Sequence, residues 1–299
     1  MYEDADPILS QYKFTNAFRA SDRVSQYLIR HVIWADKKAP SVKDQFYRTM
    51  LFKLFNKIET WEAIESEFGE ISWRDYDFRA LDSFLTSRKC ASIRNYSAAY
   101  IMPSAGSAYG LKAKHSNHLK LIEWMMGERF PERLRSCKTM MDAYQLMLSA
   151  PSVGPFLAYQ FVTDLNYGPL TSFSEMEFVQ AGPGALDGIS KCFETAQDVP
   201  AEAIIKHMAE NQDEYFDRFE IEFRNLWGRQ LQLIDCQNLF CEISKYSRAA
   251  FPEIPGRSGR TRIKQKYKPT GRLPAPFYPP DWELNDRIDS DLGEYRLAS

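Results

Sequence analysis

Apolar residues recur mainly at helical spacing along this chain, and alternating strand patterns are almost absent. Ser21 is placed to cap the first predicted helix, and Pro252 should end the last one. The spacing predicts helices over residues 21–34, 42–64, 117–126, 131–148, 201–227 and 231–250. We therefore expect a mainly α protein.

A tight turn between two apolar helices is predicted within residues 146–166. One helix should run into Ala150-Pro151-Ser152-Val153-Gly154, and the next should begin at Pro155. A helix-hairpin-helix of this kind exposes backbone N–H groups at a helix N-terminus, where they bind phosphate. Ser152, Val153 and Gly154 are therefore predicted DNA contacts. The alternative is an ordinary αα-hairpin.

Composition places the chain among soluble globular proteins, since 44% of its 299 residues are hydrophobic and 26% are charged. The sequence has no apolar run of membrane-spanning length, and its N-terminus is acidic and interrupted, unlike a secretory signal. The five cysteines are scattered, which argues against a disulfide framework. We expect a monomeric protein of the reducing cytoplasm, with no membrane partner.

Charge is concentrated near the C-terminus. Residues 256–280 hold seven basic and no acidic side chains, although the whole chain has a net charge of −2. This segment predicts DNA contacts by Arg260, Arg262, Lys264 and Lys266, and a solvated tail is the alternative. We expect a helical domain over residues 1–255 and a basic extension over residues 256–299, partly packed on that domain.

The hairpin resembles that of the helix-hairpin-helix DNA glycosylases. Pro151, Val153, Gly154 and Ala158 stand at matching positions, and Ser152 replaces the usual glycine. The resemblance implies a two-lobed glycosylase-like fold. It also implies a catalytic acid a little over twenty residues further on, at the start of the next helix.

Glu175 and Glu177 fall at the place where that acid is expected. A carboxylate there would stabilise the positive charge that develops on the sugar. The structural alternatives are a first-turn helix acid for Glu175 and a capping box of Ser174 with Glu177. In bifunctional members of that family a lysine of the second hairpin helix forms a Schiff base. No lysine lies near Phe156, the matching position here, so a glycosylase of this kind would be monofunctional. The cysteine spacing does not fit an iron–sulfur cluster.

A third candidate acid, Asp235, shares one face of a predicted helix with Asn238 and Glu242. Such a polar stripe, with Gln237 beside it, fits a pocket for a flipped base, and a solvated helix face is the alternative. Arg19 and Arg23, four residues apart, are candidates for a phosphate clamp. The remaining residues assigned to the base pocket are Asn16, Lys114, His115, His118 and Gln160. We expect no metal ion and no cofactor.

A second resemblance extends to residue 282. Its blocks are FTNAFRASDRVSQYLI (14–29), LFKLFNKIETWE (51–62), KHSNHL (114–119), EFVQAGPGAL (177–186), LQLIDCQNLFCEISKYSR (231–248), RIKQKY (262–267) and FYPPDW (277–282). Together they resemble the α-glutamyl/putrescinyl thymine pyrophosphorylase family, whose region is also the helical domain of 5-hydroxymethyluracil DNA kinases. The resemblance implies hypermodified phage DNA as the substrate. The chain has no Walker-type loop, so a kinase part is not expected in it.

Three functions remain open from the sequence, and in each the partner is double-stranded DNA with modified bases. The first, favoured by the hairpin and the acid that follows it, is a monofunctional DNA glycosylase, a hydrolase that flips and excises a modified base in anti-phage defence. The second is a transferase that replaces pyrophosphate on an activated 5-hydroxymethyl-pyrimidine with an amino acid or polyamine. The third is a non-catalytic reader of modified DNA.

Overall fold

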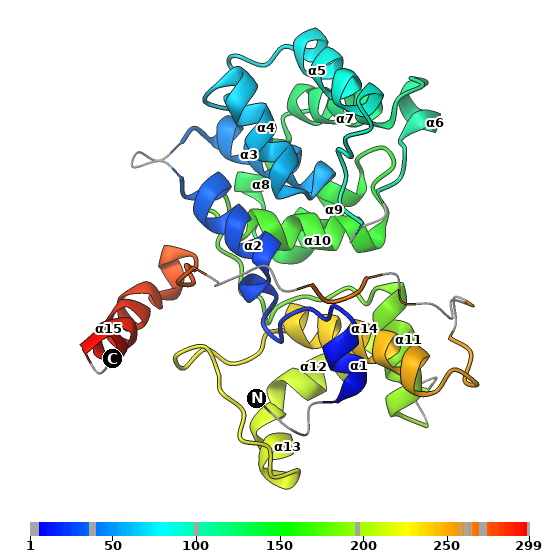
Figure 1. Cartoon of the computed structure of the whole chain (residues 1–299), viewed down its shortest axis with the longest axis vertical. Helices are drawn as coiled ribbons and strands as arrows, with labels where there is room; N and C mark the ends of the chain where they lie inside the picture. The colour runs from blue at the N-terminus through cyan, green and yellow to red at the C-terminus, as the bar shows by residue number, and fades with distance from the viewer. Residues whose placement is uncertain are drawn as a thin grey trace. The chain divides into compact units, whose positions relative to one another are not determined.

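The structure is a computed structural model that describes residues 6–35, 40–98, 102–194, 198–256, 259, 263, 265–268 and 274–297 (Figure 1). Within these residues it is helical and has no strand, so the mainly α prediction is confirmed. The longer helices are α3 (Val42–Phe55), α4 (Ile58–Phe68), α5 (Phe78–Cys90), α7 (Lys114–Gly127), α9 (Met140–Leu148), α10 (Pro155–Leu165), α11 (Pro183–Cys192), α12 (Ala201–Glu210), α14 (Leu233–Ala250) and α15 (Asn285–Leu297). The shorter elements are α1 (Pro7–Gln11), η1 (Arg19–Ser21), α2 (Arg23–Tyr27), η2 (Leu28–Ile33), α6 (Gly106–Tyr109), α8 (Phe130–Ser136), α13 (Gln212–Arg218) and η3 (Pro280–Trp282).

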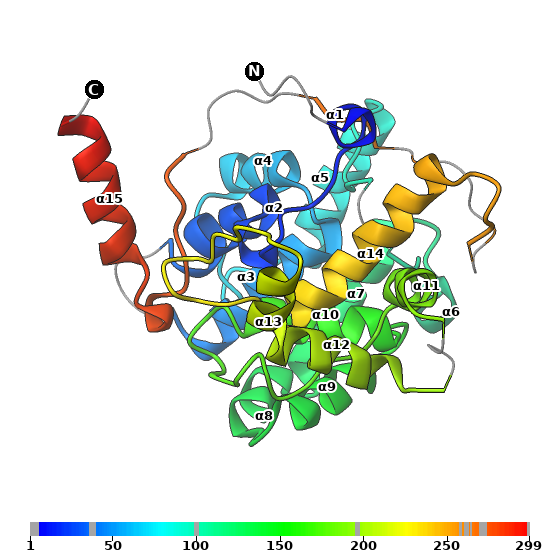
Figure 2. The ribbon, with the colours of Figure 1, turned by 90° about the horizontal axis from the view of Figure 1, so that it is seen from below.

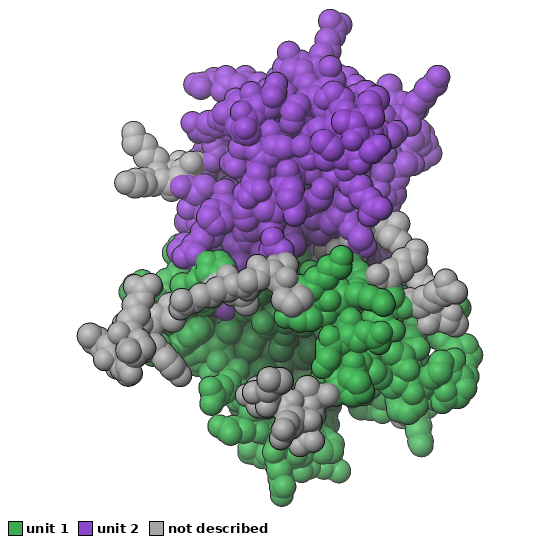
Figure 3. Space-filling view, viewed as in Figure 1, with its two compact units in different colours: residues 1–22, 175–276, 280–299 green, residues 23–174, 277–279 purple. Residues whose placement is uncertain are grey.

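The chain divides into two compact units, coloured separately in Figure 3. Unit 1 comprises residues 1–22, 175–276 and 280–299, and unit 2 comprises residues 23–174 and 277–279. Unit 1 therefore joins the start of the chain to its C-terminal part, so a site within it draws on segments far apart in sequence.

Unit 2 is organised around α3. All of its residues from Gln45 to Phe55 are buried, because the helix contacts η2, α7, α8 and α10. Ser41 caps the helix by accepting a hydrogen bond from the backbone N–H of Asp44 at 3.1 Å. A helix that is enclosed on all sides needs apolar and aromatic side chains around its whole circumference. This requirement explains why the sequence around it lacks a clear polar face.

Several predicted helices are shorter than expected, for local reasons. The 42–64 region is two helices because Asn56 adopts a left-handed backbone, with φ 48°, and ends α3. The 131–148 region is also two helices, since Thr139 and Asp142 form a capping box that starts α9. The 201–227 prediction is wrong beyond Arg218, where the chain becomes irregular and Glu220 has φ 52°.

The helix predicted over 21–34 begins later than expected. Ser21 lies in η1, a single 3₁₀ turn, and Asp22 is extended, with φ −65° and ψ 143°. The regular helix α2 therefore starts at Arg23 and continues into η2, a π-helical segment. Ser21 is thus not the cap of a continuous helix.

The predicted hairpin is present in unit 2. Helix α9 ends at Leu148, and α10 begins at Pro155 with Gly154 as its N-cap residue. Between them, Ser152 has a left-handed backbone with φ 63°, a conformation that glycine adopts at lower steric cost. The sequence therefore located both helix ends of this turn correctly.

Unit 1 depends on the close packing of α11 against α14, which lie side by side in Figures 1 and 2. Gly182 and Pro183 start α11, with proline at its first position. At Gly188 the backbone of α14 approaches so closely that a Cβ atom would overlap the carbonyl of Phe240. Glycine is therefore required at position 188 by packing.

Replacing Gly188 with alanine tests this contact. We expect Gly188→Ala to destabilise the protein by roughly 1–3 kcal/mol or more, because the added methyl group meets backbone rather than a movable side chain. Gly127→Ala is the matched control, since a Cβ atom there has no heavy atom within 4 Å. Urea unfolding followed by circular dichroism measures both variants. Equal stabilities would contradict the packing explanation.

A buried ion pair in unit 2 gives a second prediction. Lys53 Nζ lies 3.1 Å from Asp164 Oδ2 and donates a hydrogen bond to Asn56 at 2.9 Å. Removing the cation leaves a buried carboxylate less well compensated, so Lys53→Met should cost about 3–5 kcal/mol of unfolding free energy. Lys206→Met, which breaks an exposed pair with Glu210, should cost no more than about 1 kcal/mol.

The double variant Lys53→Met/Asp164→Leu separates charge from packing. It should be more stable than Lys53→Met alone, because no buried charge is left without its counter-ion. Chemical denaturation of the three variants under one set of conditions gives the comparison. If the double variant is the least stable of the three, the ion pair is not the source of the effect.

Candidate functional site

Two buried acids lie within unit 1. Glu175 lies in a turn that precedes α11, and Asp235 is in the first turn of α14. Both residues are nearly inaccessible, with exposed fractions of 6% and 5%. Since ionised carboxylates are rarely buried without compensation, the groups around this pair decide its chemistry.

Glu175 is paired with Arg229. The guanidinium Nη2 of Arg229 donates to Glu175 Oε2 in a short contact, and the same guanidinium stacks on the ring of Trp282, with Cζ 3.6 Å from the ring centroid. The other carboxylate oxygen, Oε1, is buried and has no hydrogen-bond partner within the described part of the chain. One oxygen of Glu175 is therefore held in an ion pair, and the other is a buried hydrogen-bond acceptor without a partner among the described residues.

Asp235 is held by backbone donors on both of its oxygens. Oδ1 accepts from the N–H of Arg19 at 2.7 Å, and Oδ2 accepts from the N–H of Gln232 at 2.9 Å. The second contact belongs to a capping box that starts α14. Helix capping thus fixes the position of the carboxylate.

Burial and mutual repulsion set the charge of the pair. Burial, and then the charge of Glu175, raise the pKa of Asp235 to about 7, against the opposing effect of its backbone hydrogen bonds and of Arg229. Burial also raises the pKa of Glu175, although Arg229 and Arg19 oppose this shift. Such a pair can accept or release a proton near neutral pH, as general acid–base catalysis requires.

Glu177 is exposed and lies in a bend. The expectation that residues 174–177 begin a helix is wrong, and the Ser174–Glu177 capping box therefore has no helix to cap. Residues 175 and 176 form a turn, and further along Glu202 of α12 accepts from the N–H of Ala181 at 2.9 Å and from the side chain of Gln180 at 3.1 Å. Only Glu175 of the two glutamates shares the buried environment of Asp235.

The predicted polar face of α14 packs against the N-terminal segment. Glu242 accepts from the N–H of Thr15 at 3.3 Å and from Lys245 at 2.8 Å, and Asp235 binds Arg19 on the same side. Gln237 is fully buried and donates to Cys241. Asn238 is half-buried, and Asn16 is exposed and accepts from the N–H of Phe18. Asp235 and Glu242 thus hold the N-terminal segment in place.

Arg19 and Arg23 do not share a helix face, because the extended Asp22 separates η1 from α2. Arg19 is buried in unit 1, whereas Arg23 is exposed in unit 2. The two residues therefore lack the helical spacing on which the predicted phosphate clamp depended.

The two histidines of α7 lie in hydrogen-bond networks of unit 2. His118 Nε2 bonds the carbonyl of Pro103 at 2.7 Å, so this nitrogen carries the proton and Nδ1 accepts from Tyr96 at 2.9 Å. Burial lowers the pKa of His118 to about 4. His115 contacts Thr86 at 2.8 Å, and burial lowers its pKa as well. These networks give both rings structural partners.

Lys114 lies over the ring of Tyr96, with Nζ 4.3 Å from the centroid, and Gln160 is buried in α10. These residues, with the histidines, belong to unit 2, whereas the candidate base-pocket residues of α14 belong to unit 1.

Of the basic extension, Arg260, Arg262 and Lys264 lie outside the described residues. Lys266 is exposed and pairs through its backbone with Tyr12.

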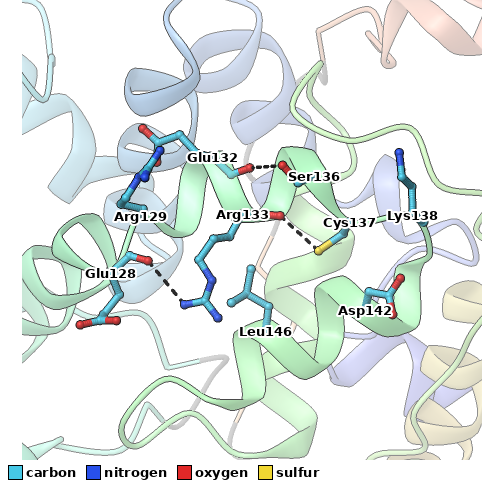
Figure 4. Close-up of a pocket in the computed structure, with 9 residues that line it drawn as sticks. All are labelled: Glu128, Arg129, Glu132, Arg133, Ser136, Cys137, Lys138, Asp142 and Leu146. Atoms are coloured by element: carbon cyan, nitrogen blue, oxygen red, sulfur yellow. Dashed lines mark hydrogen bonds between the residues drawn. The ribbon is translucent and has the colours of Figure 1, made fainter.

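A surface cavity of about 600 Å³ lies beside α8 and α9 (Figure 4). Its polar groups largely bind local backbone: Arg133 donates to the carbonyl of Glu128 at 3.4 Å, and Ser136 donates to that of Glu132 at 3.0 Å. It contains none of the predicted site residues. The cavity is therefore separate from the acid pair.

The five cysteines are free thiols. Cys90 in unit 2 and Cys192 in unit 1 are exposed, whereas burial of the thiol groups raises the pKa of Cys236 and Cys241 to about 12. Across the described residues, no three His, Cys, Asp or Glu side chains are arranged to hold a metal ion. No helix of the described segments is long and apolar enough to cross a bilayer.

Arg229 and Trp282 were missed as site residues by the sequence analysis. Trp282 was noted only as part of the FYPPDW block, with no role of its own. Arg229 is one of 38 lysine and arginine residues, and nothing in its local sequence distinguishes it. The available signal was physical: a buried acid requires a cation nearby. Sequence spacing could not select that cation, because Glu175, Arg229 and Trp282 are about fifty residues apart from one to the next.

Comparison with known proteins gives a family and one relative. The profile of a family described as the helical domain of 5-hmdU DNA kinase matches residues 4–256. A 5-hmdU DNA kinase of Bacillus phage SP10 is 26% identical over 258 residues, which cover 81% of this chain and 40% of that protein. The chain thus spans two fifths of the length of this curated relative. No solved structure matches.

The comparisons support one of the two resemblances drawn from the sequence. The likeness to the helical domain of these kinases is confirmed, whereas no helix-hairpin-helix glycosylase appears among the matches. The matched region includes Glu175, Arg229 and Asp235 and ends before Trp282. Because the profile covers most of the chain, this protein belongs to the family of 5-hmdU DNA kinase helical domains.

Proposed function

We propose that this protein is a transferase that modifies 5-hydroxymethyl-pyrimidine bases in DNA, with the buried pair of Glu175 and Asp235 as its proton acceptor. Membership of the family of 5-hmdU DNA kinase helical domains and the relative named as a 5-hmdU DNA kinase support modified DNA as the substrate. The observation that carries the proposal is the burial of the two carboxyl groups within unit 1, where Glu175 is paired with Arg229 and its Oε1 has no hydrogen-bond partner among the described residues.

The proposed reaction is a displacement at the exocyclic carbon of the base. The nitrogen of an amino acid or polyamine attacks this carbon, a C–N bond forms, and the C–O bond to pyrophosphate breaks. Pyrophosphate leaves with the bonding electrons, and the proton of the amine passes to the acid pair. A kinase acting on the hydroxymethyl group would supply phosphorylated DNA from which such a leaving group is built.

The geometry favours Glu175 as the group that receives the proton. Both oxygens of Asp235 are occupied by backbone donors, whereas Glu175 Oε1 is a buried acceptor without a partner among the described residues. In this proposal burial raises the proton affinity of Glu175. Arg229 and Arg19 balance the charge that remains.

DNA contact is assigned to the hairpin. The backbone N–H groups at the N-terminus of α10 and the partly exposed turn at Ser152 and Gly154 suit a phosphate, independent of base sequence. The target base must leave the stack, because the exocyclic carbon of a paired base is shielded. The half-buried Asn238 of α14 is a candidate for contact with the flipped base.

The glycosylase hypothesis can be tested in the same experiment as the proposed transferase. Its support was the hairpin followed by an acid, but the matched family is a helical domain of 5-hmdU DNA kinase and the relative is such a kinase. The enzyme reaction distinguishes the three functions directly. The purified chain is incubated with duplexes that carry thymine, 5-hydroxymethyluracil or its pyrophosphorylated form, together with putrescine or glutamate. Nucleosides are then analysed by mass spectrometry.

A new C–N adduct with release of pyrophosphate is expected. Free base with an abasic strand would replace the transferase with a glycosylase. Selective binding of modified duplex with no product would replace it with a reader.

Glu175→Gln tests the role of the acid in this reaction. We expect product formation to fall by about 10²–10⁴-fold, because the amide cannot accept the proton. Glu214→Gln, an exposed glutamate of α13, is the control and should retain the wild-type rate. The rate of the wild type should rise with pH as the pair becomes ionised, and burial, which raises the pKa of both carboxyl groups, should move this rise above the range of ordinary carboxyl groups. A Glu175→Gln enzyme of unchanged rate would remove Glu175 from the mechanism.

The raised pKa of Asp235 also predicts how stability depends on pH. Between the ordinary value of 3.8 and about 7, the folded protein keeps the proton of Asp235 while the unfolded chain loses it. The folded state then binds more protons, so this group lowers the unfolding free energy as pH rises, by up to about 1.4 kcal/mol per pH unit.

Unfolding of wild type and Asp235→Asn from pH 4 to pH 8 checks this dependence. The difference in unfolding free energy between them should change across that range and level off above about pH 7. Glu214→Gln should follow the wild type at every pH. A constant difference between wild type and Asp235→Asn would show that Asp235 titrates normally.

A further inference from the structure

Trp282 lies beyond the region that matches the family, which ends at residue 256. It belongs to η3, and its ring faces the guanidinium of Arg229, with Cζ 3.6 Å from the ring centroid. This distance is well within the range of a cation–π contact. A residue of the FYPPDW block, past the end of the profile match, thus touches the cation paired with Glu175.

The guanidinium of Arg229 has two different partners. One is the ring of Trp282, and the other is the carboxylate of Glu175, to which Nη2 donates. The arginine side chain is 21% exposed, whereas that of Glu175 is 5% exposed. Because the arginine is partly exposed, water competes with Glu175 for its guanidinium, and the side chain can adopt other conformations. Stacking on a planar ring restricts that freedom and leaves the edge of the guanidinium for the carboxylate.

The segment that carries Trp282 is attached to the turn that carries Arg229. Arg287 donates to the carbonyl of Trp227 at 2.6 Å, and the indole N–H of Trp227 donates to Asp291 of α15. The turn itself is closed by Arg229 N–H bonding to Leu226 at 2.9 Å. These contacts attach the C-terminal segment to the turn at a second place, apart from the ring stack. The attachment and the stack can therefore be tested by separate substitutions.

We propose that Trp282 is a positioning residue of the site, which holds the guanidinium of Arg229 against the carboxylate of Glu175. The segment around η3 thereby contributes a residue to the site of the acid pair. The catalytic consequence rests on the proposed function, whereas the positioning itself can be measured without any activity.

Four charged groups face one another here: Glu175 and Asp235 as acids, and Arg229 and Arg19 as cations. If Arg229 moves into solvent, Arg19 is the one remaining cation of these four groups that opposes the effect of burial on the pKa of Glu175. The proton affinity of the pair then increases, and a larger share of it is protonated at neutral pH. Loss of the ring should therefore shift the titration of the pair upward.

The test is a carboxyl titration by ¹³C NMR of the full chain labelled at Asp and Glu side chains. The signals of the pair are assigned from spectra of Glu175→Gln and Asp235→Asn. Trp282→Leu should shift the titration of the pair upward by about one pH unit, a roughly tenfold change in protonation equilibrium. Trp282→Phe should restore most of the wild-type titration, since phenylalanine keeps a ring for the guanidinium.

Arg287→Ala and Asp291→Asn are the matched controls. They weaken attachment of the C-terminal segment without touching the stack, and the titration should stay at the wild-type midpoint. Arg229→Gln should give the same upward shift with Trp282 intact, and adding Trp282→Leu to it should shift the titration no further. This pair of variants keeps the test valid if Trp282→Leu alone fails to fold.

An unshifted titration in Trp282→Leu would overturn the proposal, and so would an equal shift in Arg287→Ala. Where the transferase activity is present, the pH–rate profile of Trp282→Leu should move upward together with the titration. Absence of activity in the wild type would remove the proposed function, while the NMR result would still decide the role of Trp282.

Discussion

Burial of the Asp235 carboxylate at the first turn of α14 is the interaction on which the candidate site depends. Its two oxygens bind the backbone of Arg19 and of Gln232, so the same group starts the helix and ties the N-terminal segment to it. Burial and the charge of Glu175 also raise the pKa of Asp235, so that its ionised form is less favoured. The backbone hydrogen bonds of Asp235 therefore fix the architecture of the site, whereas its burial and the charge of Glu175 raise its pKa.

Local signals allowed part of this structure to be predicted. Pro155 and Gly154 marked the start of α10, and the spacing of Asp235 and Glu242 placed them on one side of α14. The breaks at Asn56 and Thr139 were missed, because apolar periodicity continues through them and only the backbone conformation or a side-chain cap reveals the end of a helix. Arg229 and Trp282 were missed for another reason, since their contacts join segments that are distant in sequence.

The family assignment changes the weight of the functional hypotheses. A hairpin followed by an acid is compatible with several DNA-acting proteins, because phosphate contact at a helix N-terminus carries no information about the bond that is broken. The match places this chain in the family of 5-hmdU DNA kinase helical domains. A buried acid pair suits a reaction in which an incoming amine must lose a proton.

The cysteines have a practical consequence. Cys90 lies exposed in unit 2 and Cys192 lies exposed in unit 1, while the thiols of Cys236 and Cys241 remain protonated and resist alkylation. The natural sequence therefore offers one accessible attachment point for a fluorophore in each unit. With the partly exposed Cys137 replaced by serine, a donor–acceptor pair on this chain would report the separation of the two units in solution.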